Sequence, residues 1–257
     1  MDTRVQTSFN VLLIGDSCVD EYRIGTVDRL SPEAPVPVIK ITSEYSVAGM
    51  ASNVHLNLKN LGINADFVHN KEIITKTRYI DKRSGQHLLR VDTEPQVTPW
   101  QGYSPHPVDF YDAVVISDYN KGFLSYDHIE DIIKLSTGPV FIDTKKQDLS
   151  RFNGAYLKIN ETEYKSRYSV NDQLIVTLGD RGAMYKNCNT EEYFQSSPVD
   201  VVDVCGCGDT FLAALVYQFL VTSDIRDAIM FANRAASLTV QRQGNFAPTL
   251  EEINARH

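Results

Sequence analysis

The sequence has no long apolar run, no excess of positive charge and few cysteines, and each absence excludes a class of protein. No window approaches the ~18 consecutive apolar residues that a membrane-spanning helix needs. The net charge of −8 argues against a nucleic-acid-binding face, which requires clustered lysine and arginine. The first ten residues are polar and lack the apolar core of a secretory signal. The sequence therefore predicts neither a membrane nor a nucleic-acid partner.

Several motifs are also missing. The four cysteines lack the spacing of a disulfide framework or of a C-x-x-C motif, so we expect a reducing, cytoplasmic location. The G-x-x-x-x-G-K-[ST] motif of P-loop proteins is missing, and so is the G-x-S-x-G motif of α/β-hydrolases. These two enzyme classes are excluded because the chain lacks their central motifs.

The sequence does contain short apolar, β-branched runs that alternate with helical patterns. This alternation is typical of a parallel sheet flanked by helices, and 257 residues are enough to bury one large core. The expected core strands are residues 11–14, 66–69, 113–117, 140–143, 156–160 and 174–178. The expected helices are residues 51–61, 125–135, 209–220, 225–240 and 249–255. Two polar, extended segments break this rhythm, at residues 22–45 and 71–91.

The most informative segment is residues 201–212, in which a β-branched run leads into two glycines and an apolar helical stretch. Gly206 and Gly208 let the backbone turn tightly, so that several N–H groups converge. A helix opening at Asp209 would add the positive end of its dipole. A transferring phosphoryl group needs such an anion hole, and a hydroxyl nucleophile needs a base such as Asp209. The expected hole is formed by the backbone of Cys205, Gly206, Cys207 and Gly208.

Two plainer interpretations apply to the same segment. Taken alone, Asp209 has the alternative role of a helix N-cap. Cys205 and Cys207 could also be read as metal ligands, but they lack the partner pair that a zinc site needs.

The Gly-x-Gly-Asp segment resembles the signature of the PfkB (ribokinase-like) carbohydrate kinases. A longer match, residues 15–22 (GDSCVDEY) with residues 31–38 (SPEAPVPV), resembles the start of the bacterial heptose-7-phosphate kinases. Shorter matches follow in family order: ITKTR at 74–78, LRVD at 89–92, SDYNKG at 117–122, IDTK at 142–145, NETE at 160–163, TLGDRG at 177–182 and FAN at 231–233. The resemblance covers the chain from residue 11 to about 250.

The resemblance implies a three-layer α/β/α sandwich with a mostly parallel sheet, built as one kinase domain over residues 1–257. Residues 22–45 and 71–91 would form a small β lid that excludes water from the sugar site. The same lid would be the place where two copies pair as a homodimer. Without the resemblance, these segments are surface hairpins. The chain is shorter than its relatives, because it lacks a βα element after residues 66–69 and further residues between Glu163 and Leu174.

The activity implied is ATP-dependent phosphorylation of a sugar or sugar phosphate, with Mg²⁺ and with K⁺ as a further ion. The acceptor would be the anomeric hydroxyl of a heptose 7-phosphate, and Asp209 would accept its proton. The nucleotide would contact Lys145, Asn160, Thr177, Gly179, Gly182 and Asn233. Glu163 would hold Mg²⁺ through water, and Asp203 lies where related kinases bind a monovalent cation. The alternative for Glu163 is a solvated loop acid.

The sugar side is assigned to a second group of residues. Asp16 and Asp20 follow the first strand, where an α/β sheet presents its loops, although Asp16 also suits a simple turn. Gly49 and Asn53, at the start of the next helix, match the family's Gly-Gly-x-x-Asn loop, with Met50 in place of the second glycine.

A phosphorylated substrate needs cationic partners, which the lid segments supply. The candidates are Lys76, Arg78 and Arg90, with Lys121 nearby in the chain. Their plainer interpretation is solvated charge at a strand edge.

Two alternative functions stay open. The chain could be a diverged, non-catalytic sugar- or nucleotide-binding member of the family, or a kinase for another sugar or nucleoside. The presence of Asp209, of both glycines and of Asn160 with Glu163 argues against a binding protein, which would need no base.

Overall fold

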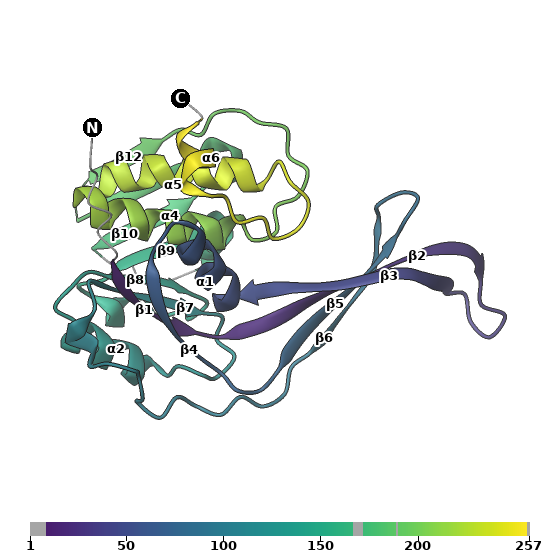
Figure 1. The fold of residues 1–257 in the computed structure, drawn as a ribbon, viewed down its shortest axis with the longest axis horizontal. Coiled ribbons are helices and arrows are strands. Elements are labelled where there is room, and N and C mark those ends of the chain that lie inside the picture. The colour runs from purple at the N-terminus through teal and green to yellow at the C-terminus, as the bar shows by residue number, and fades with distance from the viewer. Residues whose placement is uncertain (1–8, 167–171, 189, 256–257) are drawn as a thin grey trace.

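The computed structural model describes residues 9–166, 172–188 and 190–255, which form two sheets (Figure 1). The larger sheet has the strand order β12-β11-β10-β9-β8-β7-β1-β4. Its strands β1, β4, β7, β8, β9 and β10 run parallel, and β11 and β12 form an antiparallel edge. The strand bounds are Asn10–Gly15 (β1), Asn64–His69 (β4), Ala113–Asp118 (β7), Val140–Thr144 (β8), Tyr156–Asn160 (β9), Gln173–Thr177 (β10), Ala183–Asn187 (β11) and Thr190–Phe194 (β12).

Helices cover both faces of this sheet. Helices α1, α4, α5 and α6 pack on one face, and α2 packs on the other. Their bounds are Ala51–Asn60 (α1), Tyr126–Leu135 (α2), Cys207–Thr222 (α4), Ile225–Thr239 (α5) and Leu250–Asn254 (α6), while α3, Glu161–Ser166, directly follows β9. None of the helices within the described ranges is long and apolar enough to cross a bilayer.

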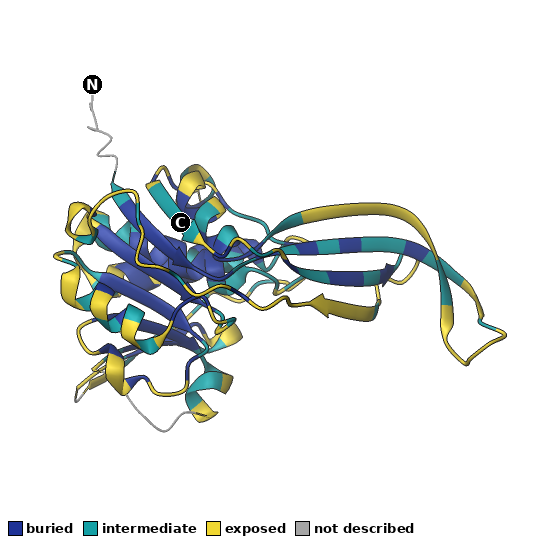
Figure 2. Cartoon of the chain, turned by 90° about the horizontal axis from the view of Figure 1, so that it is seen from below, coloured by how far each residue is buried: buried dark blue, intermediate teal, exposed yellow. Residues whose placement is uncertain are grey.

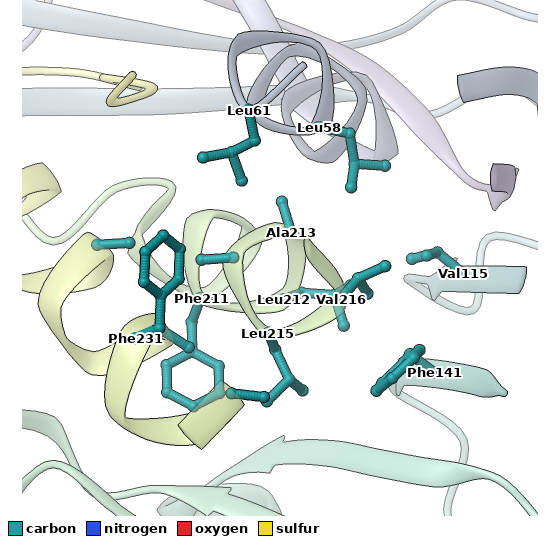
Figure 3. Packing of buried hydrophobic residues seen from close by; sticks show 14 of the residues in the cluster. Leu58, Leu61, Val115, Phe141, Phe211, Leu212, Ala213, Leu215, Val216 and Phe231 are labelled. Atoms are coloured by element: carbon teal, nitrogen blue, oxygen red, sulfur yellow. The ribbon is translucent and has the colours of Figure 1, made fainter. Parts of the chain in front are cut away.

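Helix α4 lies at the centre of one core (Figure 3). Its side chains Leu212 and Val216 face the sheet residues Val115 and Phe141, and further apolar groups of α1 and α5 surround it. A helix that is apolar on all sides is stable only when other elements enclose it. This burial fixes the position of the N-terminal turn of α4 relative to the sheet.

The second sheet is a four-stranded arm that extends away from the body (Figures 1 and 2). Its strand order is β3-β2-β5-β6, and the bounds are Ser17–Leu30 (β2), Pro37–Met50 (β3), Ile74–Asp81 (β5) and His87–Thr93 (β6). The two segments expected as a lid, residues 22–45 and 71–91, lie within these strands and their connections. Strand β2 begins at Ser17, five residues before the expected start of the lid segment at residue 22. Strand β3 ends at Met50, five residues after the expected end at residue 45, and leads directly into α1.

The expected architecture is confirmed, with corrections at particular elements. Every expected core strand and helix is present, with ends shifted by at most two residues. Helix α4 begins at Cys207 rather than at Asp209, and Asp20 lies on β2 rather than in a loop. The antiparallel pair β11 and β12 was not expected. The shortening between Glu163 and Leu174 falls partly on residues 167–171, outside the described residues.

Candidate active site

Six parallel strands end at the same edge of the large sheet, and several of the expected site residues follow those ends. In open α/β sheets this carboxyl edge is where ligands bind. The residues placed there are Asp16 after β1, Tyr119 after β7, Lys145 after β8, Asn160 at the end of β9 and Thr177 at the end of β10.

Asp209, in the first turn of α4, is 6% exposed and held at both oxygens. Asn53 Nδ2 donates to Oδ2 at 2.9 Å, and the Tyr119 hydroxyl donates to Oδ1 at 2.9 Å. Burial raises the pKa of Asp209 to about 6, although both hydrogen bonds and the charge of Lys158 act to lower it. A carboxylate with a pKa just below neutrality is well suited to accept a proton at physiological pH.

The two glycines of the turn have different roles. Gly206 is the N-cap of α4 with a φ of 74°, and a Cβ there would lie 2.7 Å from Asn53 Nδ2. Gly208 was expected to need either a positive φ or a close approach, and the structure shows the close approach, because Gly208 lies inside the first helical turn without a positive φ. A Cβ on Gly208 would instead lie 2.9 Å from Lys158 Nζ. Gly206 therefore forms the turn, and Gly208 leaves room for an ammonium group.

Lys158 is a buried cation that the sequence analysis did not single out. It lies on β9 opposite Asp143 of β8, and its Nζ donates to Asp143 Oδ2 at 2.7 Å. Burial alone would lower the pKa of Lys158, but the Asp143 carboxylate and Asp209 outweigh it and raise the pKa. A charged ammonium therefore lies against the N-terminal end of α4, whose dipole is also positive there. Two positive features at one place favour a bound anion. The signal in the sequence was a lysine inside an otherwise apolar strand.

Asp16 is 1% exposed, and burial raises its pKa. Its Oδ2 accepts a hydrogen bond from the Lys121 amide at 3.2 Å. Its Oδ1 is buried and accepts no hydrogen bond from the described residues. Such an orphaned acceptor fits a ligand hydroxyl, because burying it without a donor is costly.

Asp20 lies at the base of the arm and is held by two residues. Arg78 Nη1 donates to it at 2.7 Å, and Asn245 Nδ2, which nothing in the sequence marked as functional, donates at 3.3 Å. A Cβ on Gly49 would overlap the Asp20 carboxylate, so glycine is needed there. The expected residues Asp20, Gly49 and Arg78 therefore form one cluster.

Met50 occupies the position where the family motif has glycine, and its backbone has φ 55° and ψ −134°. This region is essentially restricted to glycine and costs a larger residue roughly 1–3 kcal/mol. The Met50 side chain is 3% exposed and packs in the core on the α2 face of the sheet. The burial of this side chain offsets part of the backbone strain.

The basic residues of the arm differ in their partners. Cross-strand register places Arg78 opposite Arg90 and Lys76 opposite Asp20, so all three basic side chains share one face with Asp20. Arg90 makes two hydrogen bonds to Asp92, at 2.7 and 2.6 Å. Lys121 pairs with Glu94 at 2.5 Å. Lys76 makes no ion pair within the described part of the chain.

A cavity of about 190 Å³ lies on the other side of the α4 turn. Its lining includes four residues expected to contact a nucleotide, Thr177, Gly179, Gly182 and Asn233, together with Cys207 and Gly208 of the expected anion hole. Val201 and Val204 contribute an apolar wall. The cavity therefore brings four of the six expected nucleotide residues and part of the expected anion hole together, whereas Lys145 and Asn160 do not line it.

Asn160 and Glu163 hold one another at the start of α3. Glu163 Oε2 accepts from the Asn160 amide at 2.9 Å, Asn160 Oδ1 accepts from the Glu163 amide at 2.8 Å, and Lys145 pairs with Glu163. Within residues 9–166, 172–188 and 190–255, no three potential metal-ligating side chains of His, Cys, Asp or Glu come together. One carboxylate at this edge fits Mg²⁺, which takes most of its ligands from water and phosphate oxygens.

Asp203 joins two loops. Its carboxylate accepts from the Cys205 amide at 2.9 Å and from the Gly244 amide at 3.0 Å. Each carboxylate oxygen retains a further lone pair. The side chain thus fixes the loop that precedes the α4 turn.

Comparison with known sequences decides the family. The model of the pfkB family carbohydrate kinases matches residues 146–252. The D-beta-D-heptose 7-phosphate kinase of Bordetella bronchiseptica is 30% identical over 95% of this chain and 94% of its own length. The chain belongs to the pfkB carbohydrate kinase family. The bifunctional protein HldE of Nitratiruptor sp. is 32% identical over 95% of this chain, which spans 64% of that protein's length.

Solved structures agree on the fold. A ribokinase of Arabidopsis thaliana complexed with ribose and ATP has a TM-score of 0.72 at 16% identity, covering 97% of this chain and 98% of its own. Phosphofructokinase-2 of Escherichia coli in complex with potassium also has a TM-score of 0.72, at 14% identity, covering 96% and 97% of the two chains. The alignments to the two pfkB relatives above extend over 299 and 301 positions, more than the 257 residues present here, so gaps fall within this chain. This agrees with the shortened form expected from the sequence.

Proposed function

We propose that this chain is an ATP-dependent kinase that phosphorylates a sugar phosphate, at the anomeric hydroxyl of a heptose 7-phosphate. The observation that carries the proposal is the buried Asp209 carboxylate. It lies at the α4 turn, between Asn53 on the sugar side and the nucleotide cavity beyond Gly208. The name of the relative in Bordetella bronchiseptica, a D-beta-D-heptose 7-phosphate kinase, supports the choice of substrate.

In this proposal Asp209 accepts the proton of the sugar hydroxyl as the bond to phosphorus forms. The Cys207 amide donates to Val204 O at 3.4 Å, whereas the Gly208 and Asp209 amides have no partner within the helix and would face the transferring phosphoryl group. The Lys158 ammonium, which donates one hydrogen bond to Asp143, adds a second positive charge beside Gly208. Charge that develops on the phosphoryl oxygens would thereby be stabilised beside the buried side chains of Asp209 and Lys158.

Two ions belong to the proposal. Glu163 would hold Mg²⁺ through water near Lys145 and Asn160, and bound Mg²⁺ would neutralise charge on the phosphate oxygens. Asp203 would contribute to a K⁺ site together with backbone carbonyl oxygens. Both assignments depend on the oxygen donors that these residues present.

The substrate would be recognised on the arm side of Asp209. The free Oδ1 of Asp16 would accept a sugar hydroxyl, while Lys76, Arg78 and Arg90 would bind the substrate phosphate. The arm would act as a lid that excludes water. Exposed apolar side chains on it, Leu30, Ile41 and Leu89, would let two copies pair as a homodimer.

The test is a substrate panel assayed by ADP formation. Heptose 7-phosphate, unphosphorylated heptose, ribose and fructose 6-phosphate are each supplied with ATP and Mg²⁺, beside Asp209→Asn as the inactive control. We expect the highest kcat/KM for heptose 7-phosphate. A higher kcat/KM for an unphosphorylated sugar would overturn the assignment of heptose 7-phosphate as the substrate. ATP binding without turnover on any sugar would favour a non-catalytic binding protein.

A further inference from the structure

Tyr119 contacts the proposed base, yet the mechanism above gives it no role. It directly follows β7, and its hydroxyl donates to Asp209 Oδ1 at 2.9 Å. Asn53 donates to the other carboxylate oxygen from α1, also at 2.9 Å. Donors from two separate elements therefore hold the carboxylate from both sides. Each oxygen keeps a lone pair for an incoming hydroxyl.

Two cations flank the Tyr119 ring. Lys76 Nζ, from β5 of the arm, lies 5.4 Å from the ring centroid, and Lys145 Nζ, after β8, also lies 5.4 Å from it. Both distances are within the range of cation–π attraction. Lys145 is itself paired with Glu163. The ring is therefore held by groups from the arm and from the edge of the large sheet, which limits the positions its hydroxyl can take.

The Tyr119 hydroxyl can act only as a donor toward Asp209. Burial and the neighbouring Asp209 charge raise the pKa of Tyr119 well above 10, so the phenol stays protonated. A hydrogen bond donated to a carboxylate favours its charged form, which is the form that accepts a proton.

We propose that Tyr119 is a positioning residue whose hydroxyl keeps the Asp209 carboxylate oriented and ionised for proton abstraction from the sugar. This inference rests on the proposed function of Asp209 as the base. Tyr119 itself contacts neither reacting atom and acts through Asp209 alone.

Other charged or titratable groups around Asp209 also influence its charge, and they come from β2, β8, β9 and α4. Lys158 of β9 favours the carboxylate, and Asp143 of β8 disfavours it. Two nearby thiols remain protonated, because burial raises the pKa of Cys18 to about 12 and also raises that of Cys207. None of these groups changes when only the Tyr119 hydroxyl is removed.

The experiment compares Tyr119→Phe with Tyr126→Phe. Tyr126 is a matched control, since its ring also lies beside two cations, with Lys146 Nζ at 5.3 Å and Arg151 Cζ at 5.1 Å. Its hydroxyl accepts from the Asp148 amide instead of contacting Asp209. The pKa of Asp209 is read from carbon-13 carboxyl resonances, assigned with Asp209→Asn, and kcat/KM is measured against pH in parallel.

We expect Tyr119→Phe to move the pKa of Asp209, and the acid limb of the kcat/KM profile, upward by about one pH unit. The KM for ATP should stay unchanged, and Tyr126→Phe should move neither quantity. An unchanged carboxyl pKa would overturn the proposal, even if the rate fell equally at every pH. A raised pKa in a protein that phosphorylates no sugar would refute the proposed function and leave the effect of Tyr119 on Asp209 established.

Discussion

Asp209 shows how two opposing effects set the charge of one residue. Burial favours the neutral acid, while the hydrogen bonds from Asn53 and Tyr119 favour the carboxylate. The result is a base that is ionised at neutral pH and still able to hold a proton during the reaction.

Removing this charge tests its role directly. Asp209→Asn keeps the shape of the side chain, so we expect the fold and the affinity for ATP to persist while kcat falls by roughly 10²–10⁴. Single-turnover assays and ATP titration measure the two quantities. Asp131→Asn, on the exposed side of α2, serves as the control, and a kcat within a few-fold of the wild type would contradict the assignment.

The same carboxyl predicts a pH dependence of both activity and stability. Because the protonated form cannot act as a base, kcat/KM should fall about tenfold per pH unit below a pKa of about 6. The pKa of Asp209 in the folded state lies above the ordinary aspartate value of 3.8, so the stability contributed by this group is complete below pH 3.8 and is lost as the pH rises through about 6. The loss is on the order of 3 kcal/mol.

Calorimetry across this range checks the sign of the effect. Asp209→Asn should melt above the wild type at pH 8, and the difference should shrink toward pH 4. A difference that grew as the pH fell would contradict the raised pKa.

At the scale of elements, the start of α4 contains two glycines whose replacement by alanine should have different effects on stability. Gly206→Ala puts a Cβ at a φ of 74° and against Asn53, and should destabilise the fold by about 1–2 kcal/mol while lowering activity. Gly208→Ala lies in ordinary helix, where alanine is favoured by about 1 kcal/mol. It should therefore melt no lower than the wild type but lose turnover, because its Cβ displaces Lys158 Nζ.

Denaturant titration and kcat of both variants distinguish the two roles. Equal losses of stability for the two alanine variants would show that Gly208 is also a conformational requirement.

Strands β5 and β6 give a second comparison. Arg78 is buried with Asp20, so Arg78→Ala leaves an uncompensated carboxylate and should cost about 3 kcal/mol of stability. Arg90 is half-exposed with Asp92, and Arg90→Ala should cost less than about 1 kcal/mol. Arg90→Ala should nonetheless raise the KM for the phosphorylated sugar by about ten- to a hundredfold.

The KM for ATP and for the unphosphorylated sugar are the controls for Arg90→Ala. If KM rises equally for both sugars, Arg90 does not bind the phosphate.

The strands also show which parts of the fold could be predicted from the sequence. Continuous apolar runs located the core strands well, because a strand buried on both faces leaves a clear pattern. The first residues of β2 were taken for a loop, since Asp16 and Asp20 interrupt the apolar pattern there. The edge strand β12 carries mixed polar sequence with little signal, and the apolar part of β11 is only three residues long. Within the site, Asp209 and Gly206 could be predicted from local sequence. Lys158 and Asn245 could not, because their roles depend on partners far away in the chain.

At the scale of the whole molecule, changes at the tip of the arm should not affect the stability of the body. The cores on the two faces of the large sheet include no arm residue between Cys18 and Met50. Replacing residues 31–36, at the exposed tip of the arm, by an Asn-Gly turn should therefore leave Tm almost unchanged. If copies pair through the arm, replacing Leu30, Ile41 and Leu89 by serine should instead give a monomer in sedimentation.

Circular dichroism melting and sedimentation velocity measure these two outcomes. Asn-Gly in place of two exposed residues of the loop at 83–86 controls for the effect of the new turn. A drop in Tm like that of a core substitution would show that the arm tip contributes to the body.

The place of β1 in the large sheet has a consequence for how the chain is made. This strand precedes the other described strands in the chain, yet it lies between β4 and β7, and its Val11 and Leu13 share a core with α4. The nascent chain must therefore keep an apolar strand uncovered until more than two hundred residues have been synthesised. Late closure of this kind slows folding and prolongs exposure to aggregation. Ribosome-bound chains that end before Cys207 should thus remain protease-sensitive and bind chaperones, and protection should begin only once α4 has emerged.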